Sequence, residues 1–500
     1  MPPAEDRDDR SAADLLAERR RKLERLRESG VDPYPVSFHD RRPVAEILDE
    51  YAKLEAGEEA SEPQRVAGRL TARRGHGGAA FLDLQDRSAK IQLHARQDVL
   101  GEESFGRLVG LDLGDLIGVE GPAFRTRRGE LSLRVDGWTL LSKSLRPAPD
   151  KYHGLADVEL RYRHRELDLL ANDETRELFL LRTRVVAAVR RFLDARGFLE
   201  VETPVLQPLY GGALARPFVT HHNALDRDFY LRIATELYLK RLIVGGLEKV
   251  YELGKDFRNE GVSHKHNPEF TMLETYEAYA DYLDVAAMTE ELVAHVAQEA
   301  RGTTKIAAGE TDVDLAPPWR RVALRDAILE RTGIDFRANR DRESLAAAMR
   351  AAGIEPDPEA GYGKLVDDLL SKQVEPTLLD PTFMLDYPVE MSPFAKAHRS
   401  EEGMVERFEG FVAGIEIANA FSELNDPDEQ RRRFEEQQRM LSGGDEEAQP
   451  HDEDYLQALE HGMPPTGGLG IGIDRLVMVL SGATSIREVV LFPALRERGY

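Results

Sequence analysis

The chain carries the sequence FRNEGVSHKHNPEF at residues 257–270 and the sequence GLGIGIDR at residues 468–475. Each stretch holds one arginine, Arg258 or Arg475, beside groups that suit a nucleotide. An aromatic ring in the first stretch can stack on a base, and the alternating glycines of the second let a flat ligand lie against the strand backbone. Together the two stretches predict a triphosphate site.

The composition indicates an enzyme with more than one domain. A chain of 500 residues with 41% hydrophobic content can bury more than one core. No apolar run is long enough to cross a bilayer, and residues 1–10 are acidic and polar, unlike a secretory signal. Cysteine is absent, which excludes disulfides and thiolate chemistry. We therefore expect a cytoplasmic enzyme without a membrane partner.

The net charge restricts contact with nucleic acid. Asp and Glu number 91 against 67 Lys and Arg, a formal net charge of -24, which opposes binding of a polyanion. Any such contact must therefore be local. A stretch with leucines at roughly helical spacing offers one candidate, although a solvated surface helix is slightly favoured by this stretch alone. Its basic residues are Arg19, Arg20, Arg21, Lys22, Arg25 and Arg27.

Residues 64–141 contain five segments with strand character and a short helical piece at 104–109, between the third and fourth segments. This order predicts an OB-fold barrel. The second and third segments form the usual oligonucleotide face, which places Phe81 and Gln92 there. A lone Phe such as Phe81 is more often a core residue than a stacking platform. The five segments are 66–70, 80–84, 91–94, 116–121 and 131–141.

Beyond a linker at residues 146–149, the pattern predicts a long helix at 173–196, which Gly197 ends as a left-handed cap. Residues 198–205 then read as a strand, and Pro204 within it indicates a sheet edge. Such an edge is a natural place for a second subunit, although a covered edge within one chain explains it equally well.

Residues 249–282 predict two strands and a joining loop. If the strands are antiparallel neighbours, period-two alternation places Arg258 and Glu260 on one face, and likewise Glu274 and Tyr276. All four side chains can then point into one cleft. The alternative is a surface ion pair between Arg258 and Glu260, with an exposed strand face for the other two.

A second hairpin supplies the metal prediction. Ala413 and Gly414 form a possible two-residue turn, so residue 411 would face residue 416 and residue 409 would face residue 418. Glu409 and Glu416 then lie diagonally, about 7 to 8 Å apart at the backbone, where two glutamates can hold Mg²⁺. Two solvated carboxylates on an exposed ladder remain the alternative.

Three further glutamates, Glu236, Glu274 and Glu423, would be costly near a triphosphate unless a cation lies beside them. Magnesium accounts for one pair of glutamates only. The others could select a substrate with a protonated amine.

The chain resembles the bacterial-type class II lysyl-tRNA synthetases over about residues 19–493, in a series of short sequence blocks. Any one block is weak, whereas all of them in the family's order are very specific. The resemblance implies an α+β protein with an N-terminal helical extension at 1–60, a five-stranded OB-fold anticodon-binding domain at 61–145 and a catalytic domain at 146–500. A helical insertion is expected at about 322–373. The blocks are 197–204, 211–213, 215–218, 230–253, 257–260, 266–270, 421–426 and 468–475.

For this family the implied activity joins lysine to tRNA(Lys) in two steps, through lysyl-adenylate and with release of pyrophosphate, in a homodimer. Arg258 and Arg475 would be catalytic, stabilising charge as the carboxylate attacks phosphorus without a protein base. Glu409 and Glu416 would hold Mg²⁺. The implied ATP-binding residues are Arg258, Glu260, His266, Asn267, Phe270 and Arg475. Those implied for lysine are Glu236, Arg258, Glu274, Tyr276, Asn419 and Glu423, and those for the anticodon are Phe81, Gln92 and Glu130.

Some positions depart from the family pattern. Ala418 and Ala420 stand where many members have glycine, so their methyl groups could crowd the lysine channel or stiffen the strand. Thr235 stands where some members have proline. Two other functions are weighed: a paralogue that places a lysine-like amino acid on a protein or lipid, and a noncatalytic RNA-binding protein. The complete barrel argues against the first, and the charges grouped around a triphosphate site argue against the second.

Overall fold

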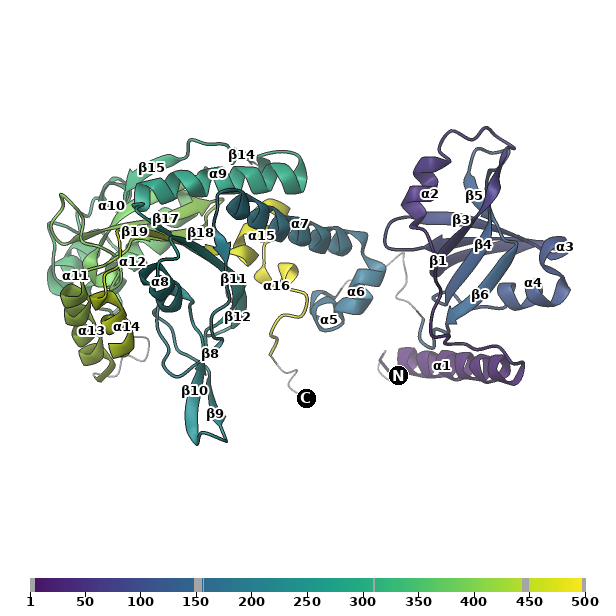
Figure 1. Cartoon of the computed structure of the whole chain (residues 1–500), viewed down its shortest axis with the longest axis horizontal. Coiled ribbons are helices and arrows are strands. Elements are labelled where there is room, and N and C mark those ends of the chain that lie inside the picture. Colours follow the sequence, from purple (N-terminus) through teal and green to yellow (C-terminus); the bar gives the residue numbers. More distant parts are fainter. Residues whose placement is uncertain (1–4, 148–154, 156, 309–310, 443–448, 497–500) are drawn as a thin grey trace. The chain divides into compact units, whose positions relative to one another are not determined.

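The computed structural model describes residues 5–147, 155, 157–308, 311–442 and 449–496. The chain divides into two compact units, Met1–Ala156 and Asp157–Tyr500, which are described separately (Figure 1). The second half of the predicted linker lies outside the described residues. No helix in the described part of the chain is both long and apolar enough to span a membrane.

The N-terminal unit is a closed barrel with flanking helices. β1 pairs with both β2 and β4, which closes a ring in the order β1-β2-β3-β5-β4, and β6 adds to β4. The predicted barrel and the helix after its third strand are confirmed. The strands are β1 (Glu59–His76), β2 (Ala79–Gln85), β3 (Lys90–Arg96), β4 (Leu116–Arg125), β5 (Leu131–Arg134) and β6 (Gly137–Ser142). The helices are α1 (Glu5–Glu28), α2 (Val44–Glu50), α3 (Gln97–Leu100) and α4 (Glu102–Val109).

The predicted fifth segment, residues 131–141, is two strands, not one. β5 and β6 pair with opposite ends of β4, on either side of Gly121 and Pro122. Pro122 has no N–H to offer the ladder. A Cβ at Gly121 would lie 1.8 Å from the carbonyl oxygen of Arg134, so only glycine allows this close approach. The ladder breaks at this step, and the chain turns between β5 and β6.

Two residues of the predicted basic cluster are used within the N-terminal unit. Arg19 is 9% exposed and donates to the carbonyl oxygens of Leu113 at 3.0 Å and Ser144 at 3.2 Å. Lys22 forms an ion pair with Asp112. Both side chains therefore hold α1 against the barrel. The cluster members that stay exposed are Arg20, Arg21, Arg25 and Arg27.

The C-terminal unit is built on an eight-stranded, mostly antiparallel sheet in the order β15-β16-β17-β18-β19-β12-β11-β7. β8, β9 and β10 form a separate three-stranded sheet, and β13 and β14 form an antiparallel two-stranded sheet. The strands of the large sheet are β7 (Leu199–Glu200), β11 (Lys249–Phe257), β12 (Glu269–Ala278), β15 (Arg320–Ala323), β16 (Thr382–Pro388), β17 (Met404–Val412), β18 (Ile415–Ser422) and β19 (Thr466–Gly472). The others are β8 (Leu206–Gln207), β9 (Val219–His222), β10 (Arg227–Leu231), β13 (Lys305–Ala308) and β14 (Thr311–Asp314).

Helices cover both faces of the large sheet. α7 (Asp173–Ala195), α9 (Tyr282–Arg301) and α15 (Ile473–Ser481) share a core with Leu273 of β12. α8 (Glu236–Val244) and α14 (Glu453–Glu460) pack on the other side with Tyr276. The alternation predicted along β12 is thereby confirmed. The remaining α-helices are α5 (Val158–Arg163), α6 (Arg165–Ala171), α10 (Leu324–Thr332), α11 (Arg342–Ala351), α12 (Tyr362–Leu369), α13 (Pro427–Ser442) and α16 (Ile486–Val489).

The segment expected to be helical at about 322–373 contains α10, α11 and α12, followed by the π-helix η1 (Leu370–Val374). Two short 3-10 helices, η2 (Glu375–Thr377) and η3 (Val389–Met391), lie further along. The buried side chains of this segment form their own core with β16 and β17. This core supports the strand that carries Glu409.

The predicted helix at 173–196 is confirmed as α7, and Gly197 follows it with φ of +79°. The strand predicted at 198–205 is wrong in length, because β7 spans only Leu199–Glu200. Thr203 bonds the side chain of Glu252, with Oγ1 to Oε2 at 2.7 Å, in place of a longer strand ladder. β7 does lie at the sheet edge, parallel to β11, so the edge prediction is confirmed.

Candidate active site

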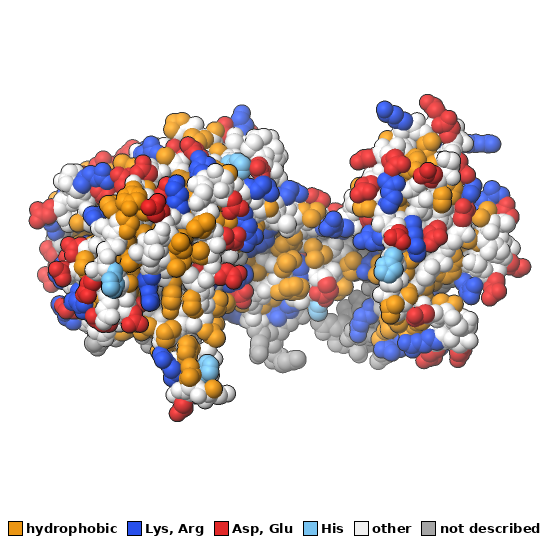
Figure 2. All heavy atoms as spheres, viewed as in Figure 1, with side chains coloured by type: hydrophobic (Ala, Val, Ile, Leu, Met, Phe, Trp, Pro, Cys, Tyr) orange, Lys and Arg blue, Asp and Glu red, His pale blue; other side chains and the backbone are white. Residues whose placement is uncertain are grey.

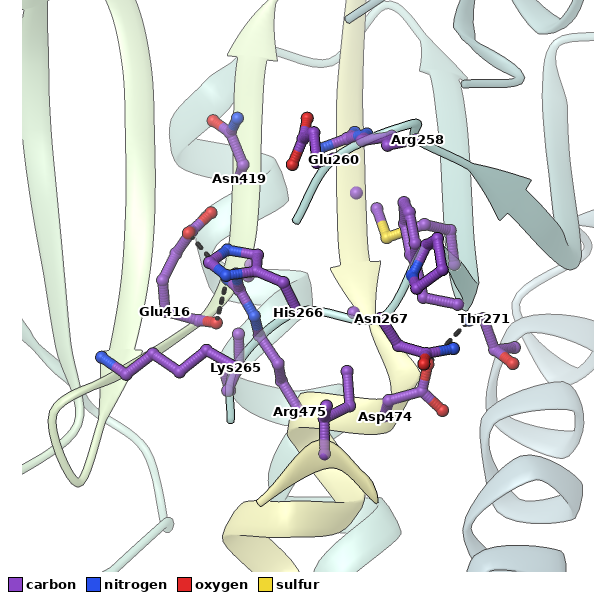
Figure 3. A pocket seen from close by; sticks show the side chains of 18 of the residues that line it. Arg258, Glu260, Lys265, His266, Asn267, Thr271, Glu416, Asn419, Asp474 and Arg475 are labelled. Carbon is purple, nitrogen blue, oxygen red and sulfur yellow. Dashed lines mark hydrogen bonds and ion pairs between the residues drawn. The ribbon is translucent and has the colours of Figure 1, made fainter. Parts of the chain in front are cut away.

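Two adjoining cavities lie along β12, β18 and β19. The first, of about 210 Å³, is lined by these strands, by the loop after β11 and by the start of α15 (Figure 3). The second, of about 220 Å³, is lined by the same strands and by α8. Both cavities share four wall residues, so one ligand can contact both. The shared residues are Arg258, Met272, Asn419 and Gly470.

Arg258 is held at the junction of the cavities. Its backbone N–H donates to the Pro268 carbonyl at 2.9 Å, and its Nε donates to the Ile233 carbonyl at 3.4 Å. Its guanidinium lies 5.1 Å from the centre of the Phe270 ring, a cation–π contact. The side chains of Arg258 and Glu260, both described, form no ion pair with each other. The surface-pair alternative is therefore wrong, and Arg258 keeps hydrogen-bonding capacity for a ligand.

The loop before β12 contributes His266, which can titrate, and Asn267, which fixes the loop by hydrogen bonds. Nδ1 of His266 lies 2.9 Å from the Ser263 hydroxyl, and burial, aided by the charge of Arg475, lowers the pKa of His266. At neutral pH without a ligand, this imidazole is therefore mostly neutral. Asn267 lines the first cavity, but its Oδ1 accepts from the Ala494 N–H at 3.1 Å and its Nδ2 donates to the Glu269 carbonyl. Asn267 thus also fixes the loop.

Arg475 and Glu416 are paired with each other in the wall of the first cavity (Figure 3). Nη1 of Arg475 donates to Oε2 of Glu416 at 2.8 Å and to its carbonyl at 3.0 Å. Lys265 lines the same cavity and was missed by the sequence prediction, which had no signal for the direction of a loop lysine. The cavity therefore presents cationic groups from different elements, those of Arg258, Lys265 and Arg475. Three carboxylates also line it, those of Glu260, Glu416 and Asp474.

The hairpin register differs from the prediction at one pair. Residues 411 and 416 face each other as predicted, but Glu409 pairs with Asn419 and not with residue 418. The cause is a register shift between Gly410 and Phe411, which a turn-based count cannot detect. The predicted turn is confirmed, with positive φ at Ala413.

Glu409 lies in a buried network. It accepts from the Tyr387 hydroxyl at 2.9 Å and pairs with Arg407 at 2.5 Å. Burial raises the pKa of Glu409 to about 7, against the effect of Arg407 and with a further rise from the charge of Glu416. The solvated-ladder alternative is wrong for Glu409, which is 9% exposed. In the described residues, no group of three or more His, Asp or Glu side chains is placed to hold a metal, so this pair would supply only part of a coordination shell.

The second cavity is acidic. Glu236, Glu274 and Glu423 line it and are at most 6% exposed. The Tyr276 hydroxyl donates to Oε2 of Glu274 at 3.0 Å. Burial raises the pKa values of Glu274 and Glu423 to about 8, and neighbouring carboxylates add to the rise. Asn419 also lines this cavity, so all six residues predicted to bind lysine are brought together.

Two cationic residues beside this cavity were missed. Arg407 lines it and donates to Oδ1 of Asn419 at 3.1 Å. Lys240 is fully buried and forms ion pairs with both Glu236 and Glu423. The spacing of Glu236 and Lys240 is the usual one for a helical ion pair, but it gave no sign that the pair is buried.

Gly468 has a different role from the one predicted for the strand glycines. A Cβ at this position would lie 1.9 Å from Oε1 of Glu423 and 2.6 Å from Cε1 of Tyr276. Glycine therefore lets two side chains of the acidic cavity lie against the backbone of β19. Gly472, which lines the first cavity, has only ordinary contacts, at 3.7 Å or more from Arg475.

The departures from the family pattern do not crowd the acidic cavity. Ala418 and Ala420 are both in the core under α9 and α15, and neither lines that cavity. Ala418 lines only the first one. Thr235 is buried, and its N–H donates to Oε1 of Glu274 at 3.2 Å. A proline would lack this N–H, so threonine adds one contact to the cavity wall.

On the barrel, Phe81 and Gln92 lie on neighbouring strands and on one face. Phe81 stacks on His94 with ring centres 4.6 Å apart and an angle of 10° between the planes. Oε1 of Gln92 accepts from the hydroxyl of Ser132 at 3.0 Å. Glu130 is exposed in the β4–β5 connection. The stacking partner His94 was not predicted, although alternation places it on the same face as Gln92.

The architecture and the paired cavities define a class II tRNA synthetase. Residues 157–496 match the family model described as tRNA synthetases class II (D, K and N), and residues 64–141 match the model of the OB-fold nucleic acid binding domain. The chain is 54% identical over 485 residues to the lysine–tRNA ligase of Moorella thermoacetica, covering 97% of this chain and 98% of that one. It is 51% identical to the enzyme of the same name from Carboxydothermus hydrogenoformans and 50% identical to that of Bacillus subtilis, each with 97% and 98% covered.

The chain belongs to the lysine–tRNA ligase family of class II tRNA synthetases. The family resemblance that its sequence blocks predicted is thereby confirmed.

Proposed function

We propose that this protein activates L-lysine with ATP to lysyl-adenylate and pyrophosphate, and then transfers lysine to the 3'-terminal adenosine of tRNA(Lys). The observation that carries the proposal is the acidic cavity beside the arginine-lined cavity, with Arg258 in the wall of both. An anionic or neutral amino-acid side chain would require cationic or amide partners in place of Glu423. The acidic wall therefore supports lysine, in agreement with the name of the relatives.

The activation step needs charge stabilisation and positioning more than proton transfer. A carboxylate oxygen of lysine attacks the α-phosphorus, and the bond from that phosphorus to the bridging oxygen of pyrophosphate breaks. Arg258 would neutralise the carboxylate and the α-phosphate as they approach, and Arg475, with His266, would bind the outer phosphates. Phe270 would stack on adenine opposite Arg475, and Glu260 would accept from its amino group.

Lysine would be recognised by its two ammonium groups. Glu236 would accept from the α-ammonium, and Tyr276 with Glu423 would bind the ε-ammonium, with Glu274 beside them. The carboxyl groups whose pKa values are raised in the empty cavity would ionise beside the incoming cations.

The carboxylates Glu409 and Glu416 fit Mg²⁺ by their chemistry, since oxygen donors are the ligands it prefers. The mutual charge of the pair, which helps to raise the pKa of Glu409, is a second reason to expect a cation there. Bound there with the phosphates, Mg²⁺ would neutralise phosphate charge. With few protein ligands, the rest of its shell would come from ATP and water.

Residues 61–145 would read the anticodon, and residues 146–500 would carry the catalytic chemistry. Phe81 offers one ring face to a base, because His94 covers the other. Gln92 and Glu130 would contact base edges. The four exposed arginines of α1 could add phosphate contacts.

The active unit would be a cytoplasmic homodimer. Apolar side chains are exposed beside the sheet edge and along the β8–β10 sheet, where Figure 2 shows hydrophobic side chains gathered on the surface. Among the residues that the structure describes, edge strand β7 has a partner strand on one side only. A second copy that covers this region would bury both features. The exposed residues are Leu199, Val205, Leu206, Val219 and Leu225.

The deciding experiment is amino-acid-dependent exchange between ATP and pyrophosphate, with lysine, aspartate and asparagine tested separately. Lysine alone should support exchange, and Arg258→Ala should abolish it. Arg325→Ala is the matched control, since Arg325 pairs with Asp335 away from both cavities. Exchange with aspartate or asparagine instead would overturn the lysine assignment. The absence of exchange with all three amino acids would support a noncatalytic protein.

A further inference from the structure

Lys240 of α8 lies behind the wall of the acidic cavity. It is 0% exposed and does not line the cavity itself. Four of the groups around its ammonium do line it: the carboxylates of Glu236 and Glu423 and the rings of Tyr276 and Phe394. The ring centres lie 5.9 Å and 5.2 Å from Nζ. Lys240 is therefore a built-in cation directly behind the proposed amine site.

The contacts of Lys240 engage one oxygen of each carboxylate. Nζ contacts Oε1 of Glu236 and Oε2 of Glu423. The other oxygen of Glu423 is the one that approaches Gly468 and has no hydrogen-bond partner in the described part of the chain. A carboxylate held this way has a fixed direction and retains an oxygen for a second cation.

The charges of the cavity balance only when Lys240 is counted. Three carboxylates, those of Glu236, Glu274 and Glu423, form its acidic wall. Lysine brings two ammonium groups, and its carboxylate pairs with Arg258 under the proposed function. Arg407 also lines the cavity, but it pairs with Glu409, which does not. One cation is then lacking, and Lys240 supplies it. Without this cation, one buried carboxylate would be left uncompensated or would take up a proton.

On the basis of the proposed function, we propose that Lys240 is a positioning residue that directs Glu236 and Glu423 and favours their ionised form when a substrate ammonium arrives, and so gives the cavity its preference for an amino acid with two ammonium groups. It touches neither substrate nor the reacting atoms. Its effect is on how well lysine is bound and distinguished, and not on the chemical step.

The groups that face Lys240 from neighbouring elements are acidic or neutral. They are Glu236 on its own helix, Tyr276 on β12, Glu423 after β18 and Tyr455 on α14. Burial disfavours the charged ammonium, but Glu236 and Glu423 outweigh this effect and raise the pKa of Lys240. The ammonium therefore stays charged at any pH used in an assay. Lys240 in turn lowers the pKa values of Glu236 and Glu423 against the rise caused by burial. Removing it should therefore keep these carboxyl groups protonated near neutral pH even when lysine is offered.

The test is Lys240→Met, with Lys249→Met as the matched control. Lys249 of β11 pairs with Glu277 of β12 at 2.6 Å and lines neither cavity. In the exchange assay at pH 7, Lys240→Met should raise KM for lysine at least about tenfold, with kcat and the KM for ATP within about threefold of wild type. Raising the pH towards 9 should restore much of the lysine affinity, because the carboxyl groups then ionise. Lys249→Met should leave KM unchanged.

Charge selectivity separates positioning from a general structural defect. The analogue hydroxynorleucine carries a hydroxyl in place of the ε-ammonium. The ratio of kcat/KM for lysine over this analogue should fall about tenfold in Lys240→Met. A merely structural role would lower both substrates equally and leave the ratio and the pH profile unchanged, which would overturn the proposal.

Folding of each variant is checked by thermal melting. If Lys240→Met does not fold, Lys240→Gln and Lys240→Arg replace it. The arginine variant should keep the lysine preference and the glutamine variant should lose it, and equal behaviour of the two would overturn the proposal. Failure of the proposed function itself is distinguishable, because wild type would then show no lysine-dependent exchange at all.

Discussion

Replacement of Gly468 by alanine tests how the acidic cavity is built. The new Cβ would lie 1.9 Å from Oε1 of Glu423 and 2.6 Å from Cε1 of Tyr276. Neither side chain can move away easily. Glu423 is 1% exposed and contacts Lys240, and the Tyr276 hydroxyl is bonded to Glu274 at 3.0 Å. The substitution should therefore displace the proposed acceptor of the ε-ammonium.

The expected size follows from these contacts. Carbon and oxygen normally approach no closer than about 3 Å, so the carboxylate must shift by about 1 Å or more. Overpacking of this kind costs about 1 to 3 kcal/mol of folding stability. Loss of a hydrogen bond to a charged group costs about 1.5 to 3 kcal/mol, and about 1.4 kcal/mol corresponds to a factor of ten. We expect KM for lysine to rise about 10- to 100-fold.

Alanine substitutions at the other glycines of β19 serve as internal controls. At Gly470 the added Cβ would lie 3.2 Å from Cε of Met272, the flexible end of a side chain in the wall of both cavities. At Gly472 its nearest contacts are ordinary, and that residue lines the first cavity only. Gly361→Ala controls for the substitution itself, because no atom of the described residues lies within 4 Å of the added Cβ.

The assay is lysine-dependent exchange between ATP and pyrophosphate, with KM measured for lysine and for ATP, and with Tm measured for each variant. Gly468→Ala should raise KM for lysine far more than KM for ATP, and Gly472→Ala should not raise KM for lysine. An unchanged KM for lysine in Gly468→Ala, or an equal rise for both substrates, would refute the placement of lysine in the acidic cavity.

Three further predictions concern pH, metal and tRNA. Burial raises the folded-state pKa values of Glu274 and Glu423 to about 8. Without a ligand, their contribution to the free energy of unfolding should therefore fall as pH rises from about 4.5 through 8. The increase in Tm given by saturating lysine should therefore grow between about pH 6 and 9, and a constant increase would contradict the cavity's titration. Glu409→Gln should raise the Mg²⁺ concentration needed for half-maximal exchange about tenfold or more, and should reduce the gain in Tm from ATP with Mg²⁺; an unchanged requirement would exclude Glu409 as a ligand. Phe81→Ala should raise KM for tRNA about tenfold and leave exchange without tRNA unchanged, since one base stack is worth about 1 to 3 kcal/mol; a defect in exchange would argue against a role in tRNA binding alone.

Local patterns predicted the parts of the fold that depend on neighbours in sequence. Alternation placed Glu274 and Tyr276 on one face of β12, and the turn at Ala413 was readable from its residues. The pairing of Glu409 with Asn419 could not be predicted in the same way. It results from a register shift between Gly410 and Phe411, which depends on contacts between the strands and not on the residues of the turn. The split of the fifth barrel strand likewise depends on contacts from another strand, β4.

The burial of Lys240 between Glu236 and Glu423 could not be predicted from the sequence. In the sequence, Glu236 was predicted to bind lysine, whereas Lys240 was not singled out, because its spacing from Glu236 is that of any helical ion pair. Their burial depends on α14 packing over α8 and on Glu423 arriving from the end of β18. The charge argument did require cations beside the glutamates, but it assigned them all to ligands. One of them is part of the protein.

The two cavities differ in how their charges are paired before any ligand arrives. The side chains of Arg475 and Glu416 are 25% and 34% exposed, and such a pair contributes about 1 kcal/mol or less. Breaking it costs little, so Arg475 can turn to phosphate while Glu416 turns to a cation. Lys240 and its partners are at most 7% exposed, and separating them would leave buried charges unpaired. The ATP cavity is therefore expected to exchange ionic partners on binding, whereas the lysine cavity is organised in advance and only adds cations to carboxylates that already have a direction.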